Sequence, residues 1–310
     1  MRDRSGITII DTGYVRPGLC AAYLVESGGR AALIDCGTAT CAQTVLDAID
    51  AAGVDRAAVD WLMVTHVHLD HAGAAGPLIR ALPNAQLVVH PRGAPHMIDP
   101  TRLIAGAKAV YGEAMFERDH AGMLPVAGDR VVIAEDGHVV ELAGRPLLCI
   151  DTPGHALHHY SVWDAATRSW FAGDTFGLSY REFDTAMGAF VVPTTSPVQF
   201  DPQQMHASID TLLARAPESI RVAHYGEVDD CVRLGADLHE QIDAMVAIAR
   251  AAHGAPDRHA QIVDGLTRLY TVRAHDHGVE DAPARVAAVL GGDIEINAMG
   301  LEVWLDRAAR

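Results

Sequence analysis

The segment THVHLDHAG, residues 65–73, places three histidines and one aspartate within six positions. These residues are His66, His68, Asp70 and His71. Histidine is frequent in this chain, at 17 of 310 residues, but the spacing is too specific to follow from composition alone. The preceding run WLMVT is short and apolar, which is typical of a buried strand. The cluster is therefore expected where a strand emerges into a loop.

A single ion does not usually take four ligands from so short a turn, so two divalent ions sharing the cluster is the simpler geometry. His66 and His68 are two positions apart and point the same way in an extended chain. Asp70 and His71 open the following helix. Three further candidate ligands each follow an apolar strand, where active sites of layered α/β folds collect. They are His155, Asp174 and His224. An aspartate can bridge two ions through its two oxygens, which favours Asp174 as a shared ligand.

Apolar runs and helical patterns alternate along the chain, which predicts an α/β fold. The glycine pair Gly28-Gly29 predicts a hairpin turn between two strands. From about residue 228 onward the pattern is helical, with three or four helices and breaks expected near 254–256, Gly278 and Gly291-Gly292. Strands are expected at 7–10, 19–27, 31–36, 61–65, 85–90, 130–135, 137–142, 146–152, 159–164, 169–174 and 220–224. Earlier helices are expected at 40–53, 71–83, 101–118 and 202–215.

The ordered motifs THxHxDH, TPGH, GD and HYG, spread over residues 65–226, resemble those of the metallo-β-lactamase superfamily. LIDCG at residues 33–37 extends the resemblance toward the N-terminus. The glyoxalase II-like branch is the most similar, in particular an uncharacterised archaeal and bacterial subgroup. The resemblance implies a four-layer αββα sandwich over residues 1–228, with a C-terminal helical extension over 229–310 packed on it.

The resemblance also implies a binuclear metal site at the edge of the two sheets. By position, His66, His68 and His155 would hold one ion. Asp70, His71 and His224 would hold the second, and Asp174 would bridge the two. Zinc is the default occupant for such ligands, with iron and manganese as alternatives.

Two ions would lower the pKa of a bridging water, and the resulting hydroxide could attack a small ester, lactone, thioester or phosphoester. Asp70 could accept and relay the proton of that water. Asp35 is predicted to hydrogen-bond the metal loop from behind, with an ordinary turn aspartate as the alternative. His159 is predicted to lie beside the ligands without binding metal, and His158 is predicted to lie on the surface.

Other functions compete with hydrolysis. A persulfide dioxygenase of similar sequence would use one iron held by two histidines and an aspartate, so seven ligands disfavour it. Nucleases share the histidine cluster, but the net charge of −16 and the scattered lysines and arginines disfavour a nucleic-acid partner. A metal-stabilised binding protein without activity is a further alternative. The expected partner is a small-molecule substrate, and a homodimer is a candidate assembly.

The expected cellular compartment depends on less specific features of the sequence. The first ten residues contain only four consecutive apolar residues, too few for a secretory signal, and no run is long enough for a membrane span. Five sparse cysteines argue against a disulfide framework, so a cytoplasmic protein is expected. His90, His96 and His120 are expected to be solvated or structural. Tyr225 and Phe200 are expected in the core, with a pocket lining as the alternative.

Overall fold

The structure is a computed structural model that describes residues 5–195 and 198–308. Residues 1–4, the start of the stretch in which no secretory signal is expected, lie outside the described residues. The chain divides into two units, each assembled from three stretches. Unit 1 comprises Met1–Asp151, His158–Gly173 and Ile220–Glu227. Unit 2 comprises Thr152–Leu157, Asp174–Ser219 and Val228–Arg310.

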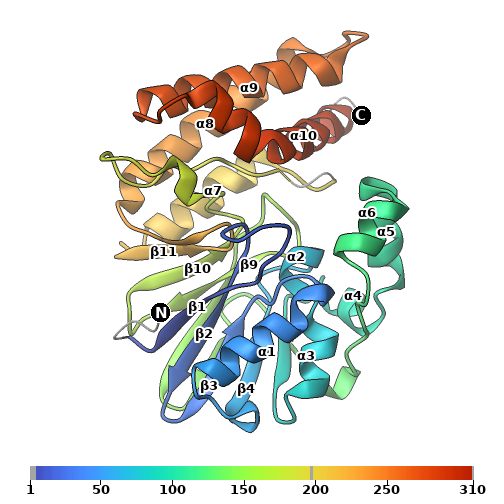
Figure 1. Ribbon diagram of the computed structural model, residues 1–310, viewed down its shortest axis with the longest axis vertical. Helices are drawn as coiled ribbons and strands as arrows, with labels where there is room; N and C mark the ends of the chain where they lie inside the picture. The colour runs from blue at the N-terminus through green and yellow to red at the C-terminus, as the bar shows by residue number, and fades with distance from the viewer. Residues whose placement is uncertain (1–4, 196–197, 309–310) are drawn as a thin grey trace. The chain divides into compact units, whose positions relative to one another are not determined.

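The first sheet of unit 1 has six strands in sequence order. The strands are β1 (Ile7–Asp11), β2 (Ala21–Ser27), β3 (Arg30–Ile34), β4 (Val59–Met63), β5 (Gln86–Val89) and β6 (Val131–Ile133). β1, β2 and β3 are antiparallel neighbours, and the predicted hairpin turn is confirmed by positive φ at Gly28 and Gly29. β3 to β6 are parallel. The carboxyl ends of β3, β4 and β5 therefore meet at one edge of the sheet (Figure 1).

The second sheet has the order β12-β11-β10-β9-β8-β7. Its strands are β7 (Val139–Leu142), β8 (Arg145–Asp151), β9 (Tyr160–Asp164), β10 (Ser169–Gly173), β11 (Ser219–Val222) and β12 (Gly226–Val228). β7 to β10 form an antiparallel meander. The predicted strands of both halves are thus present, and β12 is an additional short strand.

A buried apolar layer joins the two sheets. Tyr23 and Met63 of the first sheet and Leu147 and Phe171 of the second belong to one cluster. The rings of Tyr23 and Phe171 meet edge to face at 5.2 Å, an arrangement that aromatic pairs favour. The Tyr23 hydroxyl donates to the carbonyl of Val222 at 2.6 Å, so its one polar atom is satisfied in the core.

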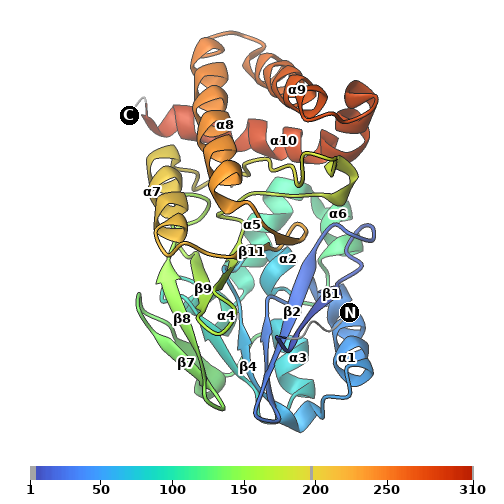
Figure 2. The same ribbon diagram turned by 90° about the vertical axis from the view of Figure 1, so that its left-hand side faces the viewer.

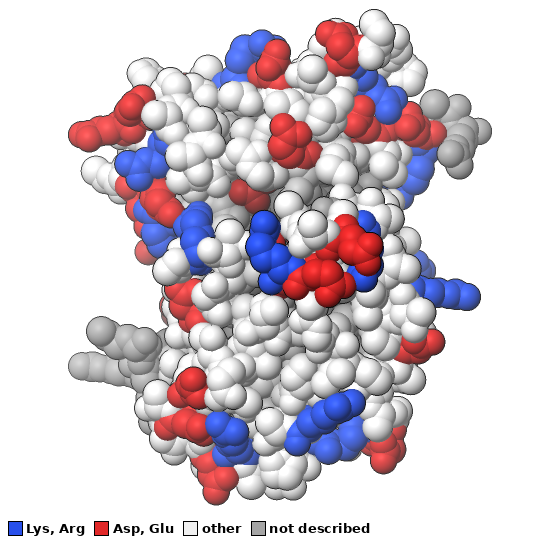
Figure 3. Space-filling model, turned by 45° about the vertical axis from the view of Figure 1, so that its right-hand side comes forward, with Lys and Arg blue, Asp and Glu red and all other residues white. Residues whose placement is uncertain are grey.

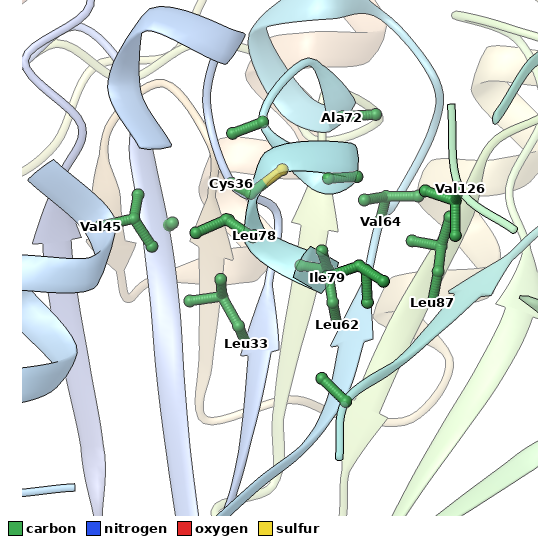
Figure 4. Packing of buried hydrophobic residues seen from close by; sticks show 14 of the residues in the cluster. Leu33, Cys36, Val45, Leu62, Val64, Ala72, Leu78, Ile79, Leu87 and Val126 are labelled. Carbon is green, nitrogen blue, oxygen red and sulfur yellow. The ribbon is translucent and has the colours of Figure 1, made fainter. Parts of the chain in front are cut away.

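The opposite face of the first sheet is covered by helices. In Figure 4, Leu33 and Leu62 of the strands point toward Val45 of α1 and Leu78 of α3. These helices of unit 1 are α1 (Ala42–Ala51), α2 (Leu69–Ala72), α3 (Ala75–Ala81), α4 (Ala94–Ile98), α5 (Thr101–Tyr111) and α6 (Glu113–Asp119). Short 3-10 turns occupy Ala39–Cys41, Arg56–Ala58, Gly128–Arg130 and, in unit 2, Arg181–Phe183.

The helix expected over residues 101–118 is two helices. Gly112 separates α5 from α6 with φ 78° and ψ 156°, a conformation that side-chain-bearing residues rarely adopt. The helix expected over 71–83 is likewise divided into α2 and α3. Pattern alone identified the helical stretches but not these interruptions.

Unit 2 contains four helices among its described residues (Figure 2). They are α7 (Pro202–Leu213), α8 (Cys231–Ala251), α9 (Arg258–Asp276) and α10 (Ala282–Ala308). The predicted breaks near 254–256 and Gly278 are confirmed, but the predicted break at Gly291-Gly292 is wrong. α10 continues through both glycines because its buried Leu290 and Ile294 pack on either side of them, and this packing offsets the roughly 1 kcal/mol cost of each helical glycine.

The C-terminal helices hold an irregular segment of the same unit. Gln241 of α8 donates to the carbonyl of Val191 at 2.9 Å. Asn297 of α10 donates to the carbonyl of Pro193 at 3.1 Å and accepts from the backbone N–H of Thr195 at 2.8 Å. Asn297 is buried, and these bonds satisfy its amide. The helices thereby fix the backbone of residues 191–195.

The predicted α/β architecture with a helical C-terminal region is confirmed. The chain passes from unit 1 to unit 2 for the last time between Glu227 and Val228, and unit 2 also includes two earlier stretches. The division into a catalytic domain over residues 1–228 and a helical extension over 229–310 stays a prediction. Within the described residues, none of the helices combines the length and apolarity that crossing a bilayer requires. On the face in Figure 3, basic and acidic side chains lie in small mixed groups.

Candidate metal centre

Three predicted ligands of unit 1 converge at the carboxyl end of the first sheet. Asp70 and His71 lie in α2, and His224 follows β11. One ligand atom from each lies within 4.8 Å of the other two. The Asp70 Oδ2 atom is 3.3 Å from His224 Nε2 and 3.6 Å from His71 Nε2. The sequence separates His224 from the other two by about half the chain, and the fold brings all three together.

Both imidazoles present the same nitrogen to this cluster. His71 Nδ1 is 3.0 Å from Asp35 Oδ2, and His224 Nδ1 is 2.7 Å from the carbonyl oxygen of Leu19. Each Nδ1–H can therefore donate to an oxygen, which leaves Nε2 directed at Asp70. An imidazole whose second nitrogen is held by a carboxylate or carbonyl is the usual state of a metal-ligating histidine. The donor set of this cluster fits a divalent transition metal.

Asp35 connects the end of β3 to the metal loop. It is buried with φ 55°, a conformation that aspartate tolerates better than most residues. Its Oδ1 accepts from the backbone N–H of Thr65 at 2.8 Å, and its Oδ2 accepts from the Thr65 hydroxyl at 2.9 Å and lies against His71. The carboxylate thus fixes both the start of the loop and the orientation of one candidate ligand. Thr65 was not singled out by the sequence.

His66 and His68 form the second part of the loop. His66 Nε2 lies 2.8 Å from His68 Nδ1. The His66 ring centroid is 4.0 Å from that of His71, so the histidines of the loop form one continuous group. His66 is fully buried, and its Nδ1 lies 3.2 Å from the Thr65 hydroxyl. The loop therefore directs these imidazoles toward one another rather than into solvent.

His158 and His159 lie beside this group. His159 is buried, and its ring stacks on that of His66 at 4.9 Å. The predicted surface position of His158 is wrong. Its side chain is 7 % exposed, and its ring lies 5.4 Å from that of His68. Burial, reinforced by nearby histidines, lowers the pKa of His158 to about 2, so this imidazole is neutral at any physiological pH.

The surroundings of Asp70 keep its carboxyl group ionised. Burial alone would raise its pKa, because desolvation disfavours the charged form. The opposing effects of His71, of the hydrogen bond from His224 and of His68 are together larger and hold the pKa well below its usual range. Asp70 is therefore an anion at neutral pH, as a metal ligand must be.

The remaining predicted ligands, His155 and Asp174, lie in unit 2. His155 Nε2 is 3.5 Å from Asp174 Oδ2, and both side chains are buried. His155 Nδ1 lies 3.4 Å from the carbonyl oxygen of Thr194, so its Nε2 faces the carboxylate. Thr194 precedes Thr195, which is held by Asn297. Asn297 is a supporting residue that the sequence did not indicate, because it lies in the C-terminal helix far from any motif.

Gly173, the residue before Asp174, ends β10 in a confined position. Its φ is 49°, and a Cβ at this position would lie 2.6 Å from both the Thr65 hydroxyl and His159 Nε2. Any larger residue would displace the metal loop. The glycine of the GD motif is therefore required by close packing against that loop.

The other singled-out residues have mainly structural contacts. His90 is buried, with Nε2 3.5 Å from Asp151 Oδ1. His120 is buried and contacts the Tyr14 hydroxyl at 3.3 Å, whereas His96 is half-buried. Tyr225 packs against the cluster between the sheets, and Phe200 is fully buried in unit 2. These positions agree with core or structural roles.

Replacing Asp35 with asparagine is expected to lower metal affinity about 10–100-fold, because the variant removes the charge that orients His71. Asparagine keeps the side-chain shape and tolerates positive φ, so the backbone should not change. Competition with a chromophoric chelator measures the affinity. Asp129→Asn, at an exposed position of unit 1, is the matched control and should leave the affinity unchanged. Equal affinities for both variants would contradict the role assigned to Asp35.

Known proteins with similar sequences and folds identify the family of this chain. Metallo-beta-lactamase fold-containing protein ST1585 of Sulfurisphaera tokodaii is 25% identical over 228 residues, which cover 72% of this chain and 79% of that protein. A hydroxyacylglutathione hydrolase of Acidiphilium cryptum is 28% identical over 260 residues, covering 82% of this chain and 85% of that enzyme. The crystal structure of a metallo-beta-lactamase family protein from Thermus thermophilus has the same fold, with a TM-score of 0.65 at 19% identity over 92% of this chain and 94% of that one.

A sequence model described as the metallo-beta-lactamase superfamily matches residues 15–226, which include all seven predicted ligands. This match covers well over half of the chain, and the fold comparison agrees with it. The predicted fold type is thereby confirmed. The protein belongs to the metallo-beta-lactamase superfamily.

Proposed function

We propose that the protein is a metal-dependent hydrolase with a binuclear site. The observation that carries the proposal is the convergence of Asp70, His71 and His224, whose ligand atoms lie within 4.8 Å of one another. Both histidines have their Nδ1 atoms held by oxygen acceptors. A cluster used only for packing would not need to direct two imidazole nitrogens and a carboxylate at a common point.

The proposed site contains all seven predicted ligands. We assign His155 and Asp174 to the same site as the ligands of unit 1. The reason is that their motifs belong to one ordered set within the region that matches the family. The first ion would be held by His66, His68 and His155, the second by Asp70, His71 and His224, with Asp174 shared. Zinc is the expected ion, and iron or manganese would suit the same nitrogen and oxygen donors.

Bound divalent ions would supply an activated water at neutral pH and polarise the oxygen of the bond to be cleaved. The protein's own contribution is orientation and proton transfer. Asp70 is ionised and can accept a proton, whereas Asp35 and the carbonyl of Leu19 hold His71 and His224 in the tautomer that presents Nε2. Asp35, His71 and His224 are buried, whereas the side chain of Asp70 is 26% exposed and remains accessible from solvent.

The proposed substrate is a small molecule with an ester, lactone, thioester or phosphoester bond. The hydroxyacylglutathione hydrolase relative supports this class, since its similarity extends over 82% of this chain. No disulfide joins any of the five cysteines, all of which are buried, which supports a reducing compartment, and we propose the cytoplasm. Homodimer formation is the proposed assembly, and light scattering on the purified chain would test it.

Metal removal tests the proposal. Purified protein is expected to contain close to two metal ions and to hydrolyse at least one member of a panel of aryl esters, lactones, thioesters and phosphoesters. Chelation should abolish that activity, and added Zn²⁺ should restore it. A full metal complement without hydrolysis across the panel would contradict the proposal. A single iron with oxygen uptake on a persulfide would instead identify a dioxygenase, and RNA binding at about 150 mM salt would favour a nuclease.

A further inference from the structure

A second group of histidines and aspartates lies in unit 2, between α7 and α8 (Figure 2). Each helix contributes one histidine and, four positions later, one aspartate. These are His206 and Asp210 on α7 and His239 and Asp243 on α8. Residues four apart share a helix face, so each His–Asp pair points the same way. The pairs cross over, because His206 Nε2 is 3.2 Å from Asp243 Oδ1 and His239 Nε2 is 3.1 Å from Asp210 Oδ1.

The two imidazoles meet end to end. Their Nδ1 atoms are 2.5 Å apart, while the ring planes differ by 13° and the centroids lie 4.8 Å apart. Rings stacked face to face keep their atoms about 3.5–4.0 Å apart, so this contact requires both rings to lie nearly in one plane with the Nδ1 atoms facing each other. The helices approach closely here because Gly235, one turn before His239, packs directly against Leu213.

The hydrogen-bond partners leave the two Nδ1 atoms facing each other. Carboxylates only accept hydrogen bonds, so each Nε2–H donates to an aspartate. Two Nδ1 lone pairs that face each other at 2.5 Å repel unless a proton or another cation lies between them. The contact is therefore a position that a cation can occupy.

We propose that His206 and His239 form a second site for a divalent transition-metal ion, separate from the seven-ligand set and independent of the proposed hydrolase function. On binding, a proton held between the two Nδ1 atoms is released to solvent and each Nδ1 lone pair forms a bond to the ion. Both Nε2–H groups remain on the carboxylates of Asp243 and Asp210, which is the pairing that supports metal-ligating histidines elsewhere. Imidazole nitrogen suits Zn²⁺, Ni²⁺ and Cu²⁺.

Solvent exposure at this position allows water molecules to complete the coordination sphere of the ion. Both imidazole side chains are 28% exposed, and the carboxylates of Asp243 and Asp210 are largely in solvent. Zinc–nitrogen bonds of about 2.0–2.1 Å require the Nδ1 atoms to separate by less than about 1 Å from their present contact, which side-chain rotation can supply. The ion would link α7 to α8 and so brace the helical part of unit 2.

His259 is an exposed histidine whose surroundings differ from those of His206 and His239. It also lies between carboxylates, with Nδ1 2.9 Å from Glu302 Oε2 and Nε2 3.0 Å from Glu295 Oε2. Both of its nitrogens are engaged as donors, and these contacts raise its pKa. No lone pair of this imidazole is directed at a second ligand nitrogen. His259 is therefore a surface ion pair, and it serves as the control.

The test is calorimetric titration of the full-length, metal-loaded protein with Zn²⁺. We expect one additional equivalent, at least 10-fold weaker in His239→Gln and about 10–100-fold weaker in Asp210→Asn, with His259→Gln unchanged. Titrations in two buffers of different ionisation enthalpy should show release of close to one proton per ion. Hydrolytic activity and circular dichroism of the variants should match the parent chain.

Two outcomes would contradict the proposed metal site between α7 and α8. The first is the lack of an additional equivalent at millimolar Zn²⁺. The second is an additional equivalent whose affinity is the same in His239→Gln as in the parent chain, which would place the ion elsewhere on the surface.

Discussion

Replacing Asp70 with asparagine is expected to lower kcat by about 10²–10⁴-fold, the usual contribution of a positioned proton acceptor. Asparagine preserves the size of the side chain but cannot accept the proton or carry the charge that His71 and His224 surround. The measurement is kcat on the best substrate of the panel, normalised to the metal content of each preparation.

Asp47→Asn is the matched control, because this aspartate lies on the exposed side of α1 and should leave kcat unchanged. An Asp70→Asn variant that retains full metal and full kcat would remove Asp70 from the mechanism. A variant that loses metal and activity together would instead assign Asp70 to metal binding alone.

Replacing Arg145 with methionine is expected to reduce the free energy of unfolding by about 3–5 kcal/mol. Arg145 Nε donates to Asp164 Oδ1 at 3.1 Å, and both side chains are nearly inaccessible to water. The variant would leave a buried carboxylate without its cation. Asp164 would keep only the weaker bonds from Thr167 and the backbone of Ala166. Chemical denaturation of the full chain measures the difference.

Two comparison variants make this result specific. Arg30→Met removes a partly exposed arginine that also pairs with an aspartate, Asp60, and should change stability far less, because water reaches and screens that pair. The double variant Arg145→Met/Asp164→Leu should be less destabilised than Arg145→Met, since it removes the uncompensated charge as well. Equal losses for Arg145→Met and Arg30→Met would show that burial does not strengthen the first pair.

The elements that the sequence predicted correctly are determined by residues close together in the sequence. The strands before Gly28 and after Gly29 are connected by a turn that glycine forms more readily than other residues. A few residues are therefore enough to predict the hairpin. The histidine cluster follows a continuous apolar run, and the chain at that point has few alternatives to a buried strand followed by a loop. The place of the motif residues just after a strand was predictable for the same reason, whereas their role as metal ligands stays a prediction.

The features that the sequence did not predict depend on distant contacts. Asn297 supports Thr195 across more than a hundred residues, and nothing in its neighbourhood in α10 marks it as different from a surface asparagine. His158 is buried by packing against His68, which its position after a turn does not reveal. Gly291 and Gly292 remain helical because of buried neighbours, a tertiary effect that overrides their intrinsic preference.

The support of His155 by α10 has a consequence for how the nascent chain matures. His155 contacts Thr194, whose neighbour Thr195 is bonded to Asn297, so the backbone beside this candidate ligand is anchored by a residue of α10. Asn297 lies 102 positions after Thr195, so the ribosome must add that whole stretch before the anchor exists. We therefore expect His155 to gain this support only after α10 has been translated.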